Sequence, residues 1–124
     1  MEYRVCRNNP APYNDLNGKI SLLGLGTMRL PLRDAADQTS IDEEKAQEIF
    51  DYAYAHGVNY FDTAYPYHGG MSEKFCGKAL AKYPRASYHL ASKLPGWLLK
   101  CDEDVPRIFN EQLANCRTDY FDFY

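Results

Sequence analysis

The chain has 124 residues, a length that suits one domain with its own core. Apolar residues make up 45% and charged residues 25%, which is typical of globular proteins. The net charge is −3 and there is no basic run, so nucleic acid and anionic membrane are excluded as expected partners. No segment approaches membrane-spanning length and the N-terminus lacks an apolar targeting region, so we expect a cytoplasmic protein.

The metal-binding residue types do not form a ligand set. The four cysteines are widely spaced and include no Cys-x-x-Cys pair, whereas zinc and iron–sulfur sites need closer ligands; they are Cys6, Cys76, Cys101 and Cys116. We therefore expect free, partly buried thiols and no metal site. His68 and His89 have no second ligand at helical or strand spacing, and we expect them to be structural or solvated.

The N-terminal part predicts a hairpin followed by a buried strand. Asn17-Gly18 is a strong turn signal, so residues 19–24 are expected to form the return strand of a hairpin. Residues 20–26 form a mostly apolar run that predicts a strand buried on both faces.

A helix is predicted after the loop that follows this strand. Ser40 with Glu43 matches a capping box, and Asp42 is an equally good N-cap. Gly57 is expected to end the helix as the residue after its C-cap.

The remainder alternates strands with helices. Strands are expected at 58–62, 88–94 and 120–124, and helices at 72–83 and from Asp102 to Cys116. Regular alternation implies a parallel sheet with right-handed crossovers in a single α/β domain. Both an open doubly wound sheet and part of a (β/α)₈ barrel fit this order, and periodicity does not separate them.

Polar residues follow three successive strands where parallel sheets form their sites. They are Gly26-Thr27-Met28, Asp62 with Tyr67, and Lys93. A lysine ammonium beside a phenol stabilises the phenolate, and an aspartate would orient that lysine. A phenol tuned in this way can give a proton to a carbonyl oxygen. Each residue alone has an ordinary structural explanation, and only their joint placement favours catalysis.

Two other signals are weaker. Gly24-x-Gly26 is not a dinucleotide fingerprint, because the third glycine and the following helix are missing. The same loop lacks the phosphate-cradling pattern that a flavodoxin-like domain would need. Trp97 follows Lys93 in a Pro95-Gly96 loop, where it would either wall a substrate pocket or pack on the last helix.

The motifs resemble those of the aldo/keto reductase family. The resemblance covers nearly the whole chain from Ile20 onward and is carried by Leu25-Gly26-Thr27-Met28-Arg29, by Phe61-Asp62-Thr63-Ala64 with Tyr67 and Ser72-Glu73, by Ser92-Lys93, and by Asp119 to Tyr124. It implies a (β/α)₈ barrel whose base the N-terminal hairpin closes. It also implies NADP(H)-dependent reduction of a small aldehyde or ketone.

The resemblance assigns roles to particular residues. Tyr67 would be the general acid, tuned by Lys93 and Asp62, and Trp97 would line the substrate pocket. Gly26, Thr27, Met28 and Asp62 would contact the cofactor. His68 stands where many members have glycine. The sequence from Tyr65 to Gly70 resembles that of a bacterial branch of the family, whose members often carry a C-terminal iron–sulfur domain.

The chain is shorter than the barrel that it resembles. A (β/α)₈ barrel takes roughly 250 residues, and the family's catalytic histidine would follow Tyr124. We therefore expect residues 1–124 to be the truncated N-terminal portion of a barrel, with three βα units and a fourth strand. Open sheet edges predict marginal stability or self-association. The alternative function is a non-catalytic fragment, or a half-barrel that needs a partner.

Overall fold

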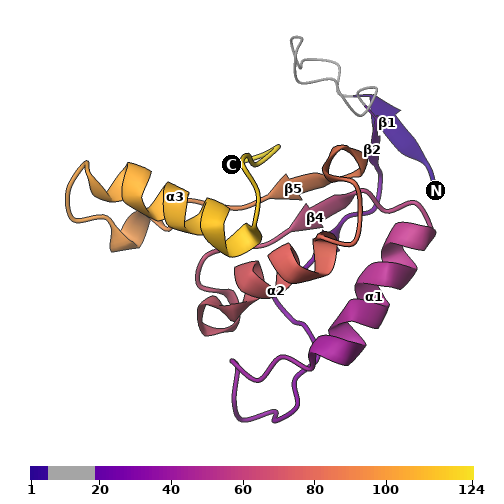
Figure 1. Cartoon of the computed structure of the whole chain (residues 1–124), viewed down its shortest axis with the longest axis horizontal. Helices are drawn as coiled ribbons and strands as arrows, with labels where there is room; N and C mark the ends of the chain where they lie inside the picture. The colour runs from indigo at the N-terminus through magenta and orange to yellow at the C-terminus, as the bar shows by residue number, and fades with distance from the viewer. Residues whose placement is uncertain (6–18) are drawn as a thin grey trace.

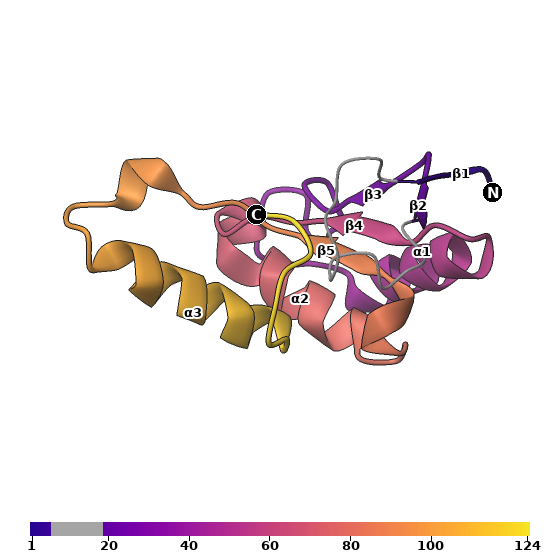
Figure 2. The same ribbon diagram turned by 90° about the horizontal axis from the view of Figure 1, so that it is seen from above.

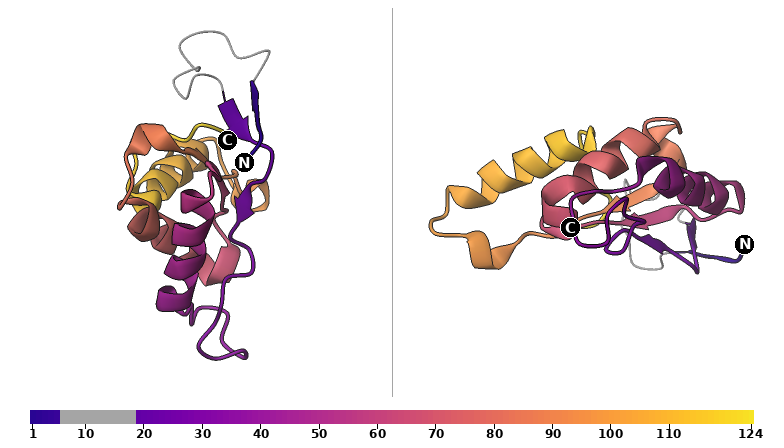
Figure 3. Two further views of the ribbon diagram at one scale, coloured as in Figure 1. Left: turned by 90° about the vertical axis from the view of Figure 1, so that its right-hand side faces the viewer. Right: turned by 90° about the horizontal axis from the view of Figure 1, so that it is seen from below.

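The computed structural model describes residues 1–5 and 19–124. Two short antiparallel strands, β1 (Tyr3–Val5) and β2 (Lys19–Ser21), form the expected hairpin. The predicted Asn17-Gly18 turn and Cys6 lie outside the described residues. In Figure 1 the hairpin lies at the opposite end of the molecule from the last helix, and the right-hand view of Figure 3 agrees.

A second sheet holds three parallel strands in the order β3 (Leu25–Gly26), β4 (Tyr60–Asp62) and β5 (His89–Ala91). The register aligns Gly26 with Asp62 and Asp62 with Ala91, so the three carboxyl ends meet at one edge. The expected fourth strand is reduced to one parallel bridge between Ala91 and Phe123. This topology confirms the α/β class with a parallel sheet.

The expectation of one buried strand over residues 20–26 is wrong. Ser21 and Asn59 exchange two hydrogen bonds through their side chains, Ser21 N to Asn59 Oδ1 at 2.8 Å and Asn59 N to Ser21 Oγ at 3.1 Å. β2 ends at Ser21, with one further bond from Leu22 N to the Glu2 carbonyl, and pairing with β4 begins at Leu25. Because β3 pairs with β4 alone, it is the edge strand of the sheet, and Gly26 is exposed.

Helix α1 (Glu43–Ala55) returns the chain from β3 to β4. Asp42 is its N-cap and accepts a bond from the Lys45 N–H at 3.3 Å. The predicted capping box between Ser40 and Glu43 does not form, because the Ser40 hydroxyl instead donates to the carbonyls of Asp34 and Asp37 in the preceding loop. Gly57 follows the C-cap with φ 87°, the left-handed conformation expected of it.

Helix α2 (Met71–Leu80) and helix α3 (Asp104–Cys116) complete the helical layer. Figure 2 shows the helices gathered on one side of the parallel sheet. Three short 3₁₀ turns separate the elements: η1 (Tyr67–Gly70), η2 (Arg85–Ser87) and η3 (Gly96–Leu98). At Gly77 a Cβ would lie 2.6 Å from the Cys116 carbonyl carbon, so only glycine lets α2 and α3 approach this closely.

The core lies between the helices and the sheet. Phe50 of α1 stacks on Phe61 of β4 at 5.3 Å between ring centroids and meets Phe75 of α2 edge-on at 5.4 Å. Leu80 and Leu90 are fully buried beside them. Each such side chain contributes about 1.5–3 kcal/mol of transfer free energy on burial. This shared core holds β4 and β5, the strands that carry the candidate site.

The C-terminal segment is pinned to β5 by Asp122. Its carboxylate accepts bonds from Arg85 Nη2 at 2.6 Å and from the Leu90 N–H at 2.8 Å. His89 Nδ1 lies 3.5 Å from the other carboxylate oxygen. Burial alone would raise the pKa of Asp122, but the interactions with His89, the Leu90 N–H and Arg85 outweigh it and the pKa is lowered. Within residues 1–5 and 19–124, no helix is long and apolar enough to cross a membrane.

Candidate active site

The predicted residues converge on the carboxyl edge of the parallel sheet. Asp62 is the last residue of β4, and Lys93 follows the end of β5 by two residues. Thr27 directly follows β3 and is bound to β4, with both its N–H and its hydroxyl donating to the Asp62 carbonyl at 2.9 and 3.0 Å. Parallel strands present their carboxyl ends together, which is why segments far apart in sequence meet here.

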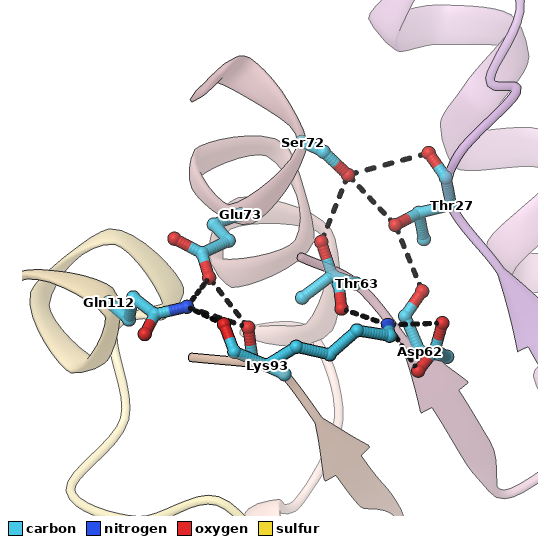
Figure 4. A network of polar contacts seen from close by, with 8 residues as sticks. Thr27, Asp62, Thr63, Ser72, Glu73, Lys93 and Gln112 are labelled. Atoms are coloured by element: carbon cyan, nitrogen blue, oxygen red, sulfur yellow. Dashed lines mark hydrogen bonds and ion pairs between the residues drawn. The ribbon is translucent and has the colours of Figure 1, made fainter. Parts of the chain in front are cut away.

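Lys93 is the centre of the exposed part of the site. Its ammonium donates to both carboxylate oxygens of Asp62 and to the Thr63 carbonyl, each at 2.8 Å (Figure 4). The Lys93 side chain remains 48% exposed and that of Asp62 34%. Water therefore screens the pair, and it is better understood as an orienting contact than as a source of stability.

Tyr67 meets Lys93 through its ring. The Lys93 ammonium lies 5.2 Å from the Tyr67 ring centroid, within the range of a cation–π contact. Among the hydrogen bonds of the described residues, none joins the Tyr67 hydroxyl to Lys93 or Asp62. The three residues are thus brought together, with the ammonium facing the ring rather than bound to the hydroxyl.

The residues after β3 differ sharply in exposure. Thr27 is fully buried, Met28 is 59% exposed, and at Gly26 a Cβ would meet nothing within 4 Å. Thr27 therefore ties β3 to β4, while Gly26, which is in register with Asp62, and Met28 stay accessible. Trp97 lies in η3 and is 73% exposed, so the expectation that it packs on α3 is not met.

A buried hydroxyl cluster lies beneath this surface (Figure 4). Ser72 of α2 lies 2.8 Å from the Thr27 hydroxyl and 3.0 Å from the Thr63 hydroxyl, and all three side chains are fully buried. The cluster fastens β3, β4 and the start of α2 to one another. Cys76 is buried nearby, and burial raises the pKa of its thiol to about 11. Such a thiol is unreactive at neutral pH.

A second buried network links Lys93 to α3. Glu73 is fully buried, and its carboxylate accepts bonds from Ser92 Oγ at 2.7 Å, Gln112 Nε2 at 2.7 Å and Asn115 Nδ2 at 3.2 Å. Gln112 also donates to the Lys93 carbonyl at 3.1 Å. The network therefore fixes the backbone from which the Lys93 side chain projects.

This second network was not predicted from the sequence. Ser72 and Glu73 stood out only as part of a motif at a helix start, and Gln112 did not stand out at all. One signal was present: Gln112 lies four residues after Ile108 and four before Cys116, on the buried stripe of α3. A polar residue on such a stripe predicts a buried hydrogen-bonding partner.

Among the described residues, no group of three or more His, Cys, Asp or Glu side chains is arranged to hold a metal ion. Cys76, Cys101 and Cys116 are free thiols, as expected. His68 and His89 are both buried, which favours a structural role over a solvated one.

Comparison with known proteins identifies the relatives of this chain. The family model described as "Aldo/keto reductase family" matches residues 22–124. A putative aryl-alcohol dehydrogenase of Schizosaccharomyces pombe is 40% identical over 96 residues, which are 75% of this chain and 26% of that protein.

Two solved structures match over most of the chain. An aldo-keto reductase from Bacillus halodurans in its holo form has a TM-score of 0.72 and 28% identity, over 98% of this chain and 38% of that one. An aldo-keto reductase from Klebsiella pneumoniae in complex with NADPH has a TM-score of 0.66 and 26% identity, over 85% of this chain and 34% of that one. The chain thus spans well under half the length of these relatives. The structure confirms the expected fold, the N-terminal portion of a (β/α)₈ barrel.

Proposed function

The chain belongs to the aldo/keto reductase family, and from that premise we propose that residues 1–124 form one partial barrel domain that supplies the proton-donating half of an NADP(H)-dependent carbonyl reductase site. The substrate class is a small aldehyde or ketone. The observation that carries the proposal is the Lys93 ammonium, held by Asp62 and the Thr63 carbonyl at the face of Tyr67.

Tyr67 is the proposed general acid. It gives its hydroxyl proton to the carbonyl oxygen, and solvent later returns a proton to the phenolate. The Lys93 ammonium stabilises the negative charge that the proton leaves on Tyr67. Asp62 holds that ammonium in place through two bonds. Such positioning counts because proton transfer requires donor and acceptor within hydrogen-bonding reach.

The proposed place of the cofactor ring is the exposed surface at Gly26 and Met28. Gly26 leaves its backbone open, and Met28 presents an exposed apolar side chain next to it. Gly26, Thr27, Met28 and Asp62 are the residues that would hold the nicotinamide end, Thr27 through its backbone because its side chain is buried. When bound, NADPH would supply the hydride. Trp97, exposed after β5, is the proposed wall of the substrate pocket.

A titration tests the binding part of this proposal. NADPH is added to the 124-residue chain while the fluorescence of its single tryptophan, Trp97, is followed. Saturable quenching is expected, weakened at least tenfold in Lys93→Met and in Asp62→Asn. Lys82→Met is the control, because Lys82 pairs with Asp51 of α1 instead of with a proposed site residue. Equal affinity in all four proteins would refute the assigned cofactor contacts.

A turnover assay tests the chemical part. Tyr67→Phe should keep NADPH binding and lose carbonyl reduction by a factor of 10² to 10⁴, the usual contribution of a general acid. Tyr65→Phe is a matched control, since the Tyr65 hydroxyl donates to Glu111 on α3 at 3.0 Å and does not meet Lys93. Reduction that survives in Tyr67→Phe would overturn the proposal.

A specific observation supports the alternative of a half-barrel that works beside a partner. An apolar groove of about 420 Å³ lies between the edge strand β3 and α1, and Leu23, Leu25, Ile49, Tyr52 and Val58 are among its lining residues. Sedimentation of the chain alone, combined with the NADPH titration, distinguishes a half-barrel that needs a different partner from an enzyme that is completed by self-association. A folded monomer that binds no NADPH would favour the alternative, whereas an assembled species that binds it would favour an enzyme completed by association. The cytoplasmic location stays a prediction.

A further inference from the structure

We propose that His68 is a positioning residue that ties the loop after β3, residues 28–40, to the turn that carries Tyr67. The inference rests on the proposed function, because it gives His68 a role through Tyr67. His68 directly follows Tyr67 in η1, and its side chain is buried rather than solvated.

The two partners of the His68 ring fix its protonation form. The Leu30 N–H lies 3.1 Å from Nε2, and the Gln38 carbonyl oxygen lies 2.9 Å from Nδ1. A backbone N–H can only donate and a carbonyl oxygen can only accept. Nε2 must therefore be bare and Nδ1 must carry the proton. The ring joins two points of the 28–40 loop to one turn of the site.

The backbone at His68 is the second observation. His68 has φ 54° and ψ 40°, and Gly69 and Gly70 also have positive φ. The left-handed region is uncommon for a residue other than glycine. Such a conformation persists only where the surroundings hold it, which points to a use for the imidazole that glycine would not serve. The ring bonds to Leu30 and Gln38 are what hold it here.

The loop packs on the same turn at a further point. At Gly69 a Cβ would lie 2.7 Å from Thr39 Cγ2, so the loop rests directly on the backbone beside His68. The loop is closed on itself by bonds from Arg33 N to the Ser40 carbonyl and from Asp42 N to the Pro31 carbonyl. It therefore docks on the turn as a unit.

The contacts of His68 affect how the Tyr67 ring is positioned against Lys93. Tyr67 is half-buried, and the centroid of its ring lies 5.2 Å from the Lys93 ammonium. The next residue in the chain is His68, with its left-handed backbone. The other end of the docked loop begins at Met28, beside Thr27. His68 thus couples the proposed proton donor to the proposed cofactor surface, because releasing its ring frees both segments.

Nuclear magnetic resonance of the 124-residue chain tests the inference without cofactor. Nitrogen-15 labelling of histidine should show His68 as the Nδ1–H tautomer. His68→Gly relieves the backbone strain but removes both ring bonds, so it should accelerate exchange of the Leu30 amide about tenfold and shift the Tyr67 ring resonances. His68→Asn tolerates the left-handed region and keeps both an acceptor for the Leu30 N–H and a donor for the Gln38 carbonyl, so it should restore part of the protection. His56→Asn, at the exposed C-cap of α1, should change neither signal.

The outcomes separate this inference from the proposed function. An Nε2–H tautomer, or Tyr67 resonances that are unchanged in both His68 variants, would overturn the positioning role whatever the chain binds. Failure of the NADPH titration would overturn the proposed function and leave the coupling of His68 to Tyr67 standing. If His68→Gly does not fold, the wild-type tautomer and His68→Asn still decide the question.

Discussion

The buried pair Glu73 and Gln112 offers the sharpest test of how the site is held. Both side chains are fully buried, and Gln112 Nε2 donates to Glu73 Oε1 at 2.7 Å and to the Lys93 carbonyl at 3.1 Å. The perturbation is a pair of apolar replacements of similar volume, Glu73→Met and Gln112→Leu, made singly and together.

The size of the effect follows from the groups that each change leaves unpaired. Gln112→Leu strips the Lys93 carbonyl of this donor and leaves Glu73 Oε1 with Ser92 alone. A buried polar group that loses its partner costs about 1–3 kcal/mol, so the free energy of unfolding should fall by about 2–4 kcal/mol. Glu73→Met removes the carboxylate acceptor of the Ser92 hydroxyl and of the Asn115 amide, and one of the acceptors of the Gln112 amide, and should cost a similar amount.

The double variant is the decisive measurement. Replacing both residues removes the Glu73 carboxyl group and its Gln112 donor together, so their mutual bond is lost once rather than counted twice. The Ser92 and Tyr124 hydroxyls, the Asn115 amide and the Lys93 carbonyl still lose a partner, so the double variant remains less stable than the wild type. The double variant should therefore be more stable than the sum of the single losses by about 1–2 kcal/mol, a coupling typical of residues in contact. Urea unfolding followed by far-UV circular dichroism gives the three values at constant slope.

Additive losses in the double variant would refute a shared network of Glu73 and Gln112. If the double variant loses the sum of the single costs to within about 0.5 kcal/mol, the two residues do not share one network. Glu73→Met combined with Asp42→Ala is the matched control, because Asp42 caps α1 and does not contact Glu73. That pair should be additive.

Three further changes test the packing, the helix cap and the acid response. Gly77→Ala should lower the free energy of unfolding by about 1–2 kcal/mol in urea, because the α3 backbone 2.6 Å from the new Cβ outweighs the gain in helix propensity, while Gly96→Ala meets nothing within 4 Å and should be near neutral. Asp42→Ala should lower the melting temperature through the loss of about 1 kcal/mol, whereas Ser40→Ala should cost less, and equal effects would favour a capping box. The pKa of Asp122 is lowered in the folded protein, so its contribution to stability is present above the unfolded pKa near 3.9 and is lost as the pH falls through the lower folded pKa. In Asp122→Asn the free energy of unfolding, measured in urea at several acid pH values, should therefore depend less on pH than in the wild type.

The sequence by itself determined the order of elements and the place of the site. The apolar periodicities of α1 and α3 and the cap signals at Asp42 and Gly57 are local, so they were readable without the fold. Parallel strands bring their carboxyl ends together by topology alone, and this was enough to group Asp62 with Lys93. Tyr67 joined them because it follows β4 closely.

Only the tertiary structure decided how these residues meet. Residues 20–26 look like one strand, but the side-chain bonds between Ser21 and Asn59 divide it. The Lys93 ammonium lies 5.2 Å from the centroid of the Tyr67 ring and is not hydrogen-bonded to the Tyr67 hydroxyl, a detail that no sequence pattern encodes. Contacts between residues distant in sequence depend on the packing of whole elements, which spacing along the chain does not report.

The buried polar groups make the same point most clearly. Gln112 binds Glu73 across 39 positions, and His68 binds Leu30 across 38. Sequence could indicate that a glutamine on an apolar stripe needs a partner, but not which one. A buried donor finds its acceptor only after two elements have packed, so the partners of Gln112 and His68 are properties of the assembled fold.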